Sequence, residues 1–170
     1  PHGRPAVVGM SESASPSGAF DALVQWAMTA EHQADVVAAR AEFSALAGEV
    51  FEEDRQLELR LAGFLEFYLC DRVAPWAGTT PARARYLASL TTEGPRQAQA
   101  WRSFCETWHA LFEVKELEEG RVTLVALSSR SEVAVSERRA MHGLSLGDVL
   151  EARLIPFAGG LAFSSAWVWH

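Results

Sequence analysis

DRQLELRLAGFLEFYLCDR, residues 54–72, carries the densest helical apolar pattern in the chain. Its apolar side chains recur every three or four positions, which places them on one face of an α-helix. That face consists of Leu57, Leu61, Phe64, Leu65, Tyr68 and Leu69. Glu58 and Glu66 fall on the opposite side, and Asp54 can cap the first turn because its carboxylate accepts hydrogen bonds from free backbone N–H groups. Such a broad apolar face must be covered, so we predict that this stretch forms the central helix of the core.

The segments around this helix also have helical patterns. Residues 18–49 repeat apolar side chains at the same spacing and predict either one long helix or two. Thr80 followed by Pro81 is an N-cap with proline at the first helical position, and it predicts a short helix from residue 81 to about 89. Another apolar stripe predicts a helix from about 95 to 110. Residues 1–17 combine Pro, Gly and Ser without periodicity, so we expect a disordered tail there.

The apolar period changes near residue 111. It falls from about 3.6 residues to 2, the period of a β-strand that is buried on one side. The predicted strands cover residues 112–116, 122–126, 133–136, 149–157 and 161–169. The last two of them are joined by the sequence Ala158-Gly159-Gly160, which is typical of a β-hairpin turn.

Together these patterns predict an α+β fold. Its first part is an N-terminal bundle of four or five helices at residues 18–110. Its second part is a five-stranded antiparallel sheet, or a small and partly open barrel, at residues 111–170. We expect the β half to pack with the helices as one compact unit, since each half has an apolar face to bury.

The chain is acidic, with 15 Lys and Arg residues against 22 Asp and Glu residues and a net charge of −7. Binding to a polyanion demands a basic excess, so we expect no nucleic-acid partner. No apolar run approaches the about 20 residues of a membrane helix, so we expect no membrane association. Cys70 and Cys105 lie inside helical apolar patterns, and no signal-peptide segment is present, so we predict two buried thiols in a reducing cytoplasm. A disulfide between them is the less favoured alternative.

Sequence motifs for common catalytic and metal chemistries are absent. There is no CxxC or HExxH pair and the histidines are scattered, so we predict no metal site. There is no glycine-rich phosphate-binding loop, so we predict no nucleotide cofactor. Cys70 directly precedes Asp71 at a predicted helix end, where the helix dipole disfavours a thiolate, so we predict a small core residue there and not a nucleophile. No residue is predicted to be catalytic.

Five residues remain as candidates for a binding site. Asp71 and Arg72 end the central helix before a loop rich in Pro and Gly, where they either line a pocket or anchor the loop through its carbonyls; we favour the anchor. His109 lies at the end of a predicted helix and is the third candidate. Trp167 and Trp169 alternate on the last predicted strand and so share one face. That face is a binding patch if exposed and core if covered, and we favour core.

The chain contains the segments FLEFYLCDR (64–72), TTPARARYL (79–87), WHALFEVKEL (108–117) and LSLGDVLEARLIPFAGGLAFSSAWVWH (144–170). Together they resemble a family of uncharacterised bacterial proteins of the myxobacterial type, whose middle region is similar to the domain that accompanies SEC-C motifs. The resemblance implies a helical half followed by a β half in which a Gly-Asp turn enters a barrel strand. The sequence lacks the zinc-binding Cys/His tail of SEC-C proteins, so the resemblance assigns no site residue.

These observations favour a non-catalytic cytoplasmic adaptor that binds a protein partner. We expect the partner either in a cleft between helices and sheet or along an exposed sheet edge. One alternative is a small β-barrel that binds single-stranded nucleic acid through aromatic stacking and an arginine-lined groove. The arginines available for such a groove are Arg121, Arg130, Arg138, Arg139 and Arg153. The other alternative is an enzyme with a pocket around Asp71, Arg72 and His109.

Overall fold

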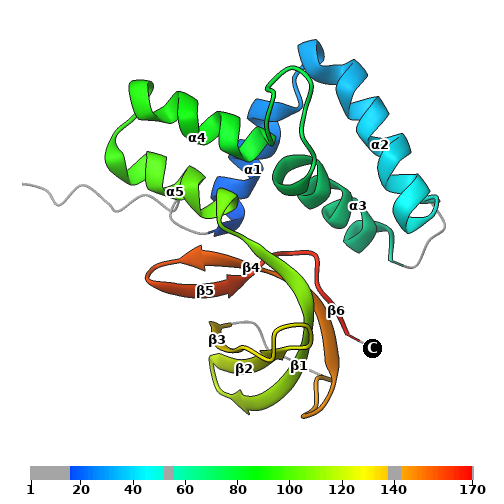
Figure 1. Cartoon of the computed structure of the whole chain (residues 1–170), viewed down its shortest axis with the longest axis vertical. Coiled ribbons are helices and arrows are strands. Elements are labelled where there is room, and N and C mark those ends of the chain that lie inside the picture. The colour runs from blue at the N-terminus through cyan, green and yellow to red at the C-terminus, as the bar shows by residue number, and fades with distance from the viewer. Residues whose placement is uncertain (1–15, 52–55, 138–142, 170) are drawn as a thin grey trace, which may run out of the picture.

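Helical and strand patterns are separated along the sequence, and so are the elements that they form. The computed structural model describes residues 16–51, 56–137 and 143–169. The α-helices in these ranges are α1 (Pro16–Ala27), α2 (Gln33–Ala47), α3 (Leu57–Glu66), α4 (Pro81–Thr92) and α5 (Pro95–Cys105). A 3-10 turn, η1 (Ala30–His32), joins α1 to α2, and a π-helical turn, η2 (Phe67–Asp71), continues α3. All of these helices lie on one side of a small barrel (Figure 1).

The ends of the described helices confirm one prediction and correct two. The cap at Thr80 is confirmed, because its side chain accepts a hydrogen bond from the Arg83 backbone N–H at 3.3 Å. α1 begins at Pro16, inside the predicted tail, because proline fits the first turn of a helix. α5 ends at Cys105 and not near 110, because Trp108 already belongs to the sheet. None of the described helices combines the length and the apolar character that a membrane span needs.

The central helix is present, but its last turn is wider than predicted. The Arg72 N–H donates to the carbonyl of Phe67 at 2.9 Å, five residues earlier, which is the bonding pattern of a π-helix. A turn of this kind brings residues five apart, such as Glu66 and Asp71, toward the same side of the helix. The predicted cap at Asp54 lies outside the described residues.

The strands of the described ranges form one sheet that curls into a barrel. They are β1 (Trp108–Glu118), β2 (Arg121–Ala126), β3 (Glu132–Ser136), β4 (Val149–Phe157), β5 (Gly160–Phe163) and β6 (Val168–Trp169). The order is β1-β2-β3-β5-β4-β6, and β4 also pairs with β1 to close the ring. β1 can serve both β2 and β4 because it is long and its register with β2 shifts between Val114 and Glu116, where a bulge bends it. This connectivity is that of five-stranded Greek-key barrels of the OB type.

Two details of the sheet differ from the prediction. The pairing of β3 with β5 is parallel, whereas an antiparallel sheet was expected. The last predicted strand, residues 161–169, is divided into β5 and β6. The division arises because the Ala166 N–H donates to Glu66 Oε1 of α3 at 3.3 Å and not to a neighbouring strand.

Two clusters of buried side chains hold the layers together. The helical cluster is built around Leu23, Phe64, Tyr68, Leu69, Trp101 and Phe104. The barrel cluster is built around Phe112, Leu124, Val135, Leu150 and Leu154. Ile155 of β4 belongs to the helical cluster, although the preceding Leu154 lies in the barrel. Successive side chains of a strand point to opposite faces, so β4 is shared by both cores.

The hairpin between β4 and β5 contains a strained residue. Phe157 pairs with Gly160, which leaves a two-residue loop in which Ala158 has φ 50° and Gly159 φ 80°. Two residues with positive φ are typical of a type I′ turn, which prefers Asn before Gly.

We expect Ala158→Asn to raise the free energy of unfolding by about 0.5–1 kcal/mol in urea denaturation. Ala158→Val is the matched control and should lower it, because β-branched side chains are disfavoured at positive φ. Equal stability of the two variants would contradict the presence of strain at residue 158.

Candidate functional site

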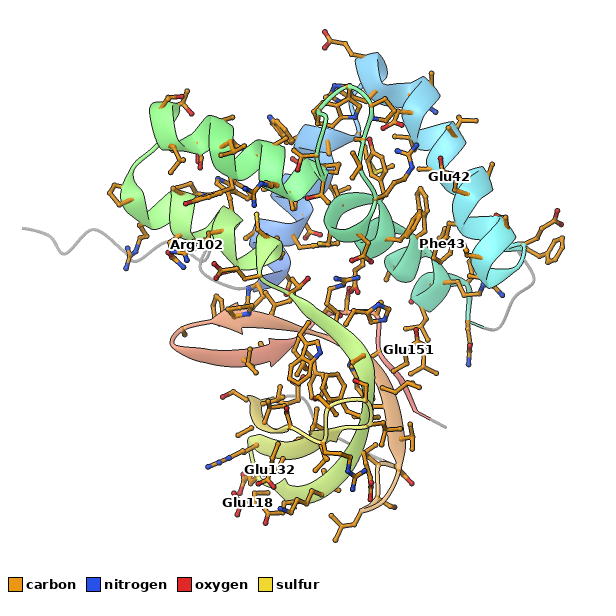
Figure 2. The ribbon with its side chains drawn as sticks, viewed as in Figure 1. Glu42, Phe43, Arg102, Glu118, Glu132 and Glu151 are labelled. Carbon is orange, nitrogen blue, oxygen red and sulfur yellow. The ribbon has the colours of Figure 1, made fainter. Side chains whose placement is uncertain are left out.

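Arg72 fastens α2 to the end of the central helix. Its Nη1 donates to Asp35 Oδ1 at 2.7 Å, and its Nε and Nη2 donate to the two carboxylate oxygens of Glu42 at 2.8 and 3.0 Å. The hydrogen bond from Arg72 lowers the pKa of the Glu42 carboxyl. Figure 2 shows Glu42 on α2, next to Phe43. Arg72 is therefore an anchor, as the favoured interpretation held. Its partners are carboxylates of α2, however, whereas loop carbonyls were predicted.

Asp71 points to the barrel and joins a network around Arg153. Arg153 Nη2 donates to Asp71 Oδ2, its Nε donates to Glu66 Oε2 at 3.2 Å, and its Nη1 donates to Thr107 Oγ1 at 2.8 Å. The second oxygen of Glu66 accepts from the Ala166 N–H. The network thus connects α3, η2, the start of β1, β4 and the segment between β5 and β6. It fills the junction between helices and sheet, where the sequence suggested a binding cleft.

Burial of Glu66 corrects the helical-wheel prediction. Glu66 was placed opposite the apolar face, yet it is 4% exposed because Arg153 reaches it from the sheet. Burial raises the pKa of Glu66, and the charge and hydrogen bonds of its neighbours only partly oppose that rise. Burial also disfavours the charge of Arg153, but its bond to Asp71 and the surrounding negative charge outweigh this effect and raise its pKa. The guanidinium therefore stays charged in the junction.

The two cysteines are unsuited to nucleophilic chemistry. Both are free thiols that pack against the helical cluster, and both residues are only partly buried where fully buried thiols were predicted. Burial raises the pKa of the Cys70 thiol to about 12, and burial also raises the pKa of Cys105. Since the thiolate is the reactive form, neither residue is activated as a nucleophile at neutral pH.

His109 lies on the outer side of the barrel, opposite Arg153 in the pairing of β1 with β4. Its Nε2 is 3.3 Å from Glu151 Oε1, and the two side chains are 43% and 51% exposed. Asp71, Arg72 and His109 each pair with a different partner, Arg153, α2 and Glu151 respectively.

No group of three or more His, Cys, Asp or Glu residues is placed to hold a metal ion in the described part of the chain.

Trp167 and Trp169 do not alternate along one strand. Trp167 lies in the segment before β6, half-buried against the barrel core, with its ring centroid 5.7 Å from that of Phe163. Trp169 belongs to β6 and its backbone pairs with Leu150, but its side chain lies outside the description. The shared aromatic face was predicted for an uninterrupted strand, which the bond from Ala166 to Glu66 prevents.

A groove of about 690 Å³ runs beside α2 and is partly open to solvent. Its lining residues are Met28, Gln33, Val36, Val37, Arg40, Ala41, Ser44, Ala45 and Glu49. Val37 is 60% exposed, although it is a large apolar side chain. We call this groove, defined by its lining residues, the α2 groove. None of the five residues predicted from the sequence belongs to it.

The α2 groove was not predicted from the sequence, because a single apolar stripe already accounts for the packing of α2 against the core. Val36, Ala39 and Phe43 form the stripe that packs into the helical cluster. Val37, Ala41 and Ala45 form a second stripe at spacings of four, and this second stripe was the available signal. Alanine has the highest helix propensity and so also occurs at exposed helix positions, and the stripe became informative only once the groove was visible.

The outward face of β2 and β3 lacks the features of a nucleic-acid site. By strand alternation it presents Arg121, Thr123, Val125, Glu132, Ala134 and Ser136, and none of these is aromatic. Two nearby basic side chains lie beside carboxylates, since Lys115 pairs with Glu132 and Arg130 lies 4.0 Å from Glu113. Figure 2 shows Glu132 and Glu118 at the end of the barrel that lies away from the helices.

No family model, no curated protein and no solved structure matches this chain. The resemblance to the domain that accompanies SEC-C motifs therefore stays a prediction.

Removal of Arg153 should destabilise the protein more than removal of Glu66. Arg153→Met leaves the buried Glu66 carboxylate without its cation, which we expect to lower the free energy of unfolding by about 3 kcal/mol. Glu66→Leu should cost less, because Asp71 and Thr107 still hold the guanidinium. The double variant Glu66→Leu/Arg153→Met should recover at least about 1 kcal/mol relative to Arg153→Met, since no buried charge is then unpaired. Urea denaturation of the four proteins measures this cycle, and additive losses would contradict the coupling.

The raised pKa of Glu66 predicts a pH dependence with a definite sign. Above the ordinary carboxyl value of 4.5, Glu66 ionises in the unfolded chain before it does so in the folded one. The folded state then binds more protons, so stability falls as the pH rises through this window. We expect Glu66→Gln to gain stability relative to the parent protein as the pH rises above 4.5. Glu118→Gln, at the exposed end of β1, controls for the loss of one negative charge, and the same trend in both variants would contradict the assignment to Glu66.

Proposed function

We propose that this protein is a non-catalytic adaptor module that binds a protein partner in the α2 groove. The observation that carries the proposal is the groove itself, an open apolar channel of about 690 Å³ beside the exposed Val37. Small-molecule sites are concave and enclose most of their ligand, with convergent polar groups. A shallow channel along a helix better suits the apolar face of another helix.

The structure of α2 supports this role because the helix is held in place on its other sides. Arg72 binds Asp35 and Glu42 on one flank, and Phe43 packs on Phe64 of α3 with ring centroids 5.8 Å apart. Beyond the last turn, Arg60 Nη2 donates to the carbonyls of Ala47 and Gly48 at 2.9 and 2.7 Å. A partner would therefore meet a surface that is already ordered, which lowers the entropic cost of binding.

The cytoplasm remains the location that we propose. Its support is the pair of free thiols at Cys70 and Cys105, which is the usual state of cysteines in a reducing compartment.

Binding of single-stranded nucleic acid is a second candidate, favoured by the OB-type connectivity of the barrel. Such barrels bind ligands on the face of strands 2 and 3 and in the loops between strands 1 and 2 and between strands 4 and 5. Here both loops are tight two-residue turns, and the face of β2 and β3 carries no stacking aromatic. A salt-dependent change in the fluorescence of a labelled single-stranded oligonucleotide on addition of the protein would favour this candidate over the adaptor.

Site-specific photocrosslinking tests the adaptor proposal. A photoreactive residue in place of Gln33, on the rim of the α2 groove, should give a discrete protein adduct in cells that produce the chain. Val37→Glu should remove the adduct, because a carboxylate in the groove disfavours apolar packing. Leu87→Glu, which changes a 49% exposed leucine on α4, is the matched control and should leave the adduct intact.

Three outcomes are decisive for the adaptor proposal. An adduct that disappears with Val37→Glu and persists with Leu87→Glu supports it. An adduct that persists in both variants, or the absence of any adduct, contradicts it. Circular dichroism of each variant confirms that the fold is unchanged before the adducts are compared.

A further inference from the structure

We propose that the α2 groove binds an amphipathic helix of another protein, and that this helix carries an Asp or Glu side chain opposite Arg40. The inference rests on the proposed function and names the chemistry of the partner. Two features of α2 support it. The spacing of the residues that line the groove suits a helix, and the position of Arg40 among them favours a carboxylate on that helix.

The residues of α2 that line the groove form two parallel rows along the helix. In each row the residues are four positions apart, which is the spacing of the ridges on a helix surface. The rows are Gln33-Val37-Ala41-Ala45 and Val36-Arg40-Ser44. The space between two such ridges accepts a ridge of another helix, and this packing gives the commonest class of helix crossing. A β-strand has no ridges of this spacing, so the rows favour a helical partner.

Most side chains in the two rows are small or apolar. Ala41, Ser44 and Ala45 permit close approach of a partner, because the distance between packed helices depends on the side chains at the contact. Val37 is 60% exposed and supplies apolar area that a partner would remove from water. The row of the partner that enters the groove is therefore expected to be apolar over these residues.

Arg40 is the charged residue of the two rows. Its side chain is exposed, its Cζ lies 5.4 Å from the centroid of the Phe64 ring, and it makes no ion pair among the described residues. The contact with the ring restricts the guanidinium before a partner arrives, so less entropy is lost when it binds a carboxylate. Glu49 also lines the groove, but it follows Gly48, where α2 has ended, and lies outside the rows.

The charges on the two flanks of α2 are compensated differently. On one flank Asp35 and Glu42 are bound by Arg72, so that flank needs no partner. On the flank of the groove, a partner that covered Arg40 without a carboxylate would remove an unpaired charge from water. An Asp or Glu opposite Arg40 avoids this cost, whereas a basic residue there would repel it. Charge therefore selects a helix that is acidic at one position of its apolar face.

The position of α2 leaves the groove accessible to a helix. Figure 1 shows α2 at the outer edge of the helical layer, away from the barrel. The two rows extend from residue 33 to residue 45, which corresponds to about 18 Å at the rise of an α-helix. A partner segment of about three to four turns is long enough to cover them.

Peptide binding to the purified full chain tests the proposal. The adduct formed by the photoreactive residue in place of Gln33 is digested, and the attached segment is identified by mass spectrometry. That segment is then synthesised with a fluorescent label, and its dissociation constant is measured by anisotropy. We expect a segment with apolar residues at spacings of three and four and one Asp or Glu among them.

Arg40→Glu should weaken binding of this peptide about tenfold, because repulsion replaces attraction. A peptide with Lys in place of its acidic residue should bind the parent protein more weakly. The same peptide should bind Arg40→Glu within about threefold of the original dissociation constant. Arg96→Glu makes the same change of net charge on an exposed arginine of α5 and should leave binding unchanged. Ala41→Trp fills the space between the rows and should abolish binding.

The outcomes separate this inference from the proposed function. A segment without Asp or Glu, or one that binds Arg40→Glu as tightly as the parent protein, overturns the acidic helix and leaves the proposed function standing. An adduct to a second copy of this chain, equal weakening by Arg96→Glu, or binding that persists with Ala41→Trp also overturns the inference. The absence of any adduct overturns both. Circular dichroism confirms that each variant is folded, and the Lys peptide tests the same ion pair without any change in the protein.

Discussion

The architecture depends on one buried cation, the guanidinium of Arg153. Removal of a charge from water costs several kcal/mol, so a buried arginine must find its compensation inside the protein. Arg153 finds it in Glu66, Asp71 and Thr107, which come from the central helix, its π-helical end and the entry to the barrel. Because Arg153 lies far along the chain from all three groups, their convergence on its side chain sets how the helices sit on the barrel. Apolar contacts such as those of Ile155 are less directional and could not set it alone.

The π-helical turn η2 makes this convergence possible. A regular α-helix would direct Asp71 away from Glu66, whereas the wider turn brings both carboxylates toward Arg153. The next residue, Arg72, then points to α2 and binds Asp35 and Glu42. Adjacent residues of opposite charge thereby serve two different interfaces, one with the barrel and one with α2. These two structural roles explain why Asp71 and Arg72, which stand out in the sequence, are bound by partners within the protein.

The surface that remains for binding lies elsewhere, on the flank of α2. The barrel has the connectivity of a ligand-binding fold, but its β1–β2 and β4–β5 turns are tight and the outward face of β2 and β3 carries no aromatic side chain. We therefore regard the barrel as the platform that orients the helical layer. The α2 groove combines small side chains with an arginine and a glutamate that make no ion pair among the described residues.

The sequence by itself determined the local structure of this protein. The changes in apolar period separated the helices from the strands, Thr80-Pro81 marked the start of α4, and the glycines after Ala158 marked the hairpin of β4 and β5. These features depend on neighbours along the chain, and local pattern is sufficient to predict them. Only the tertiary structure decided the rest: the burial of Glu66, the parallel pairing of β3 with β5, the break before β6 and the groove beside α2. The first three of these results depend on groups that are distant in sequence, and the burial of Glu66 depends on Arg153, whose position on β4 reveals nothing about the carboxylates that will meet it.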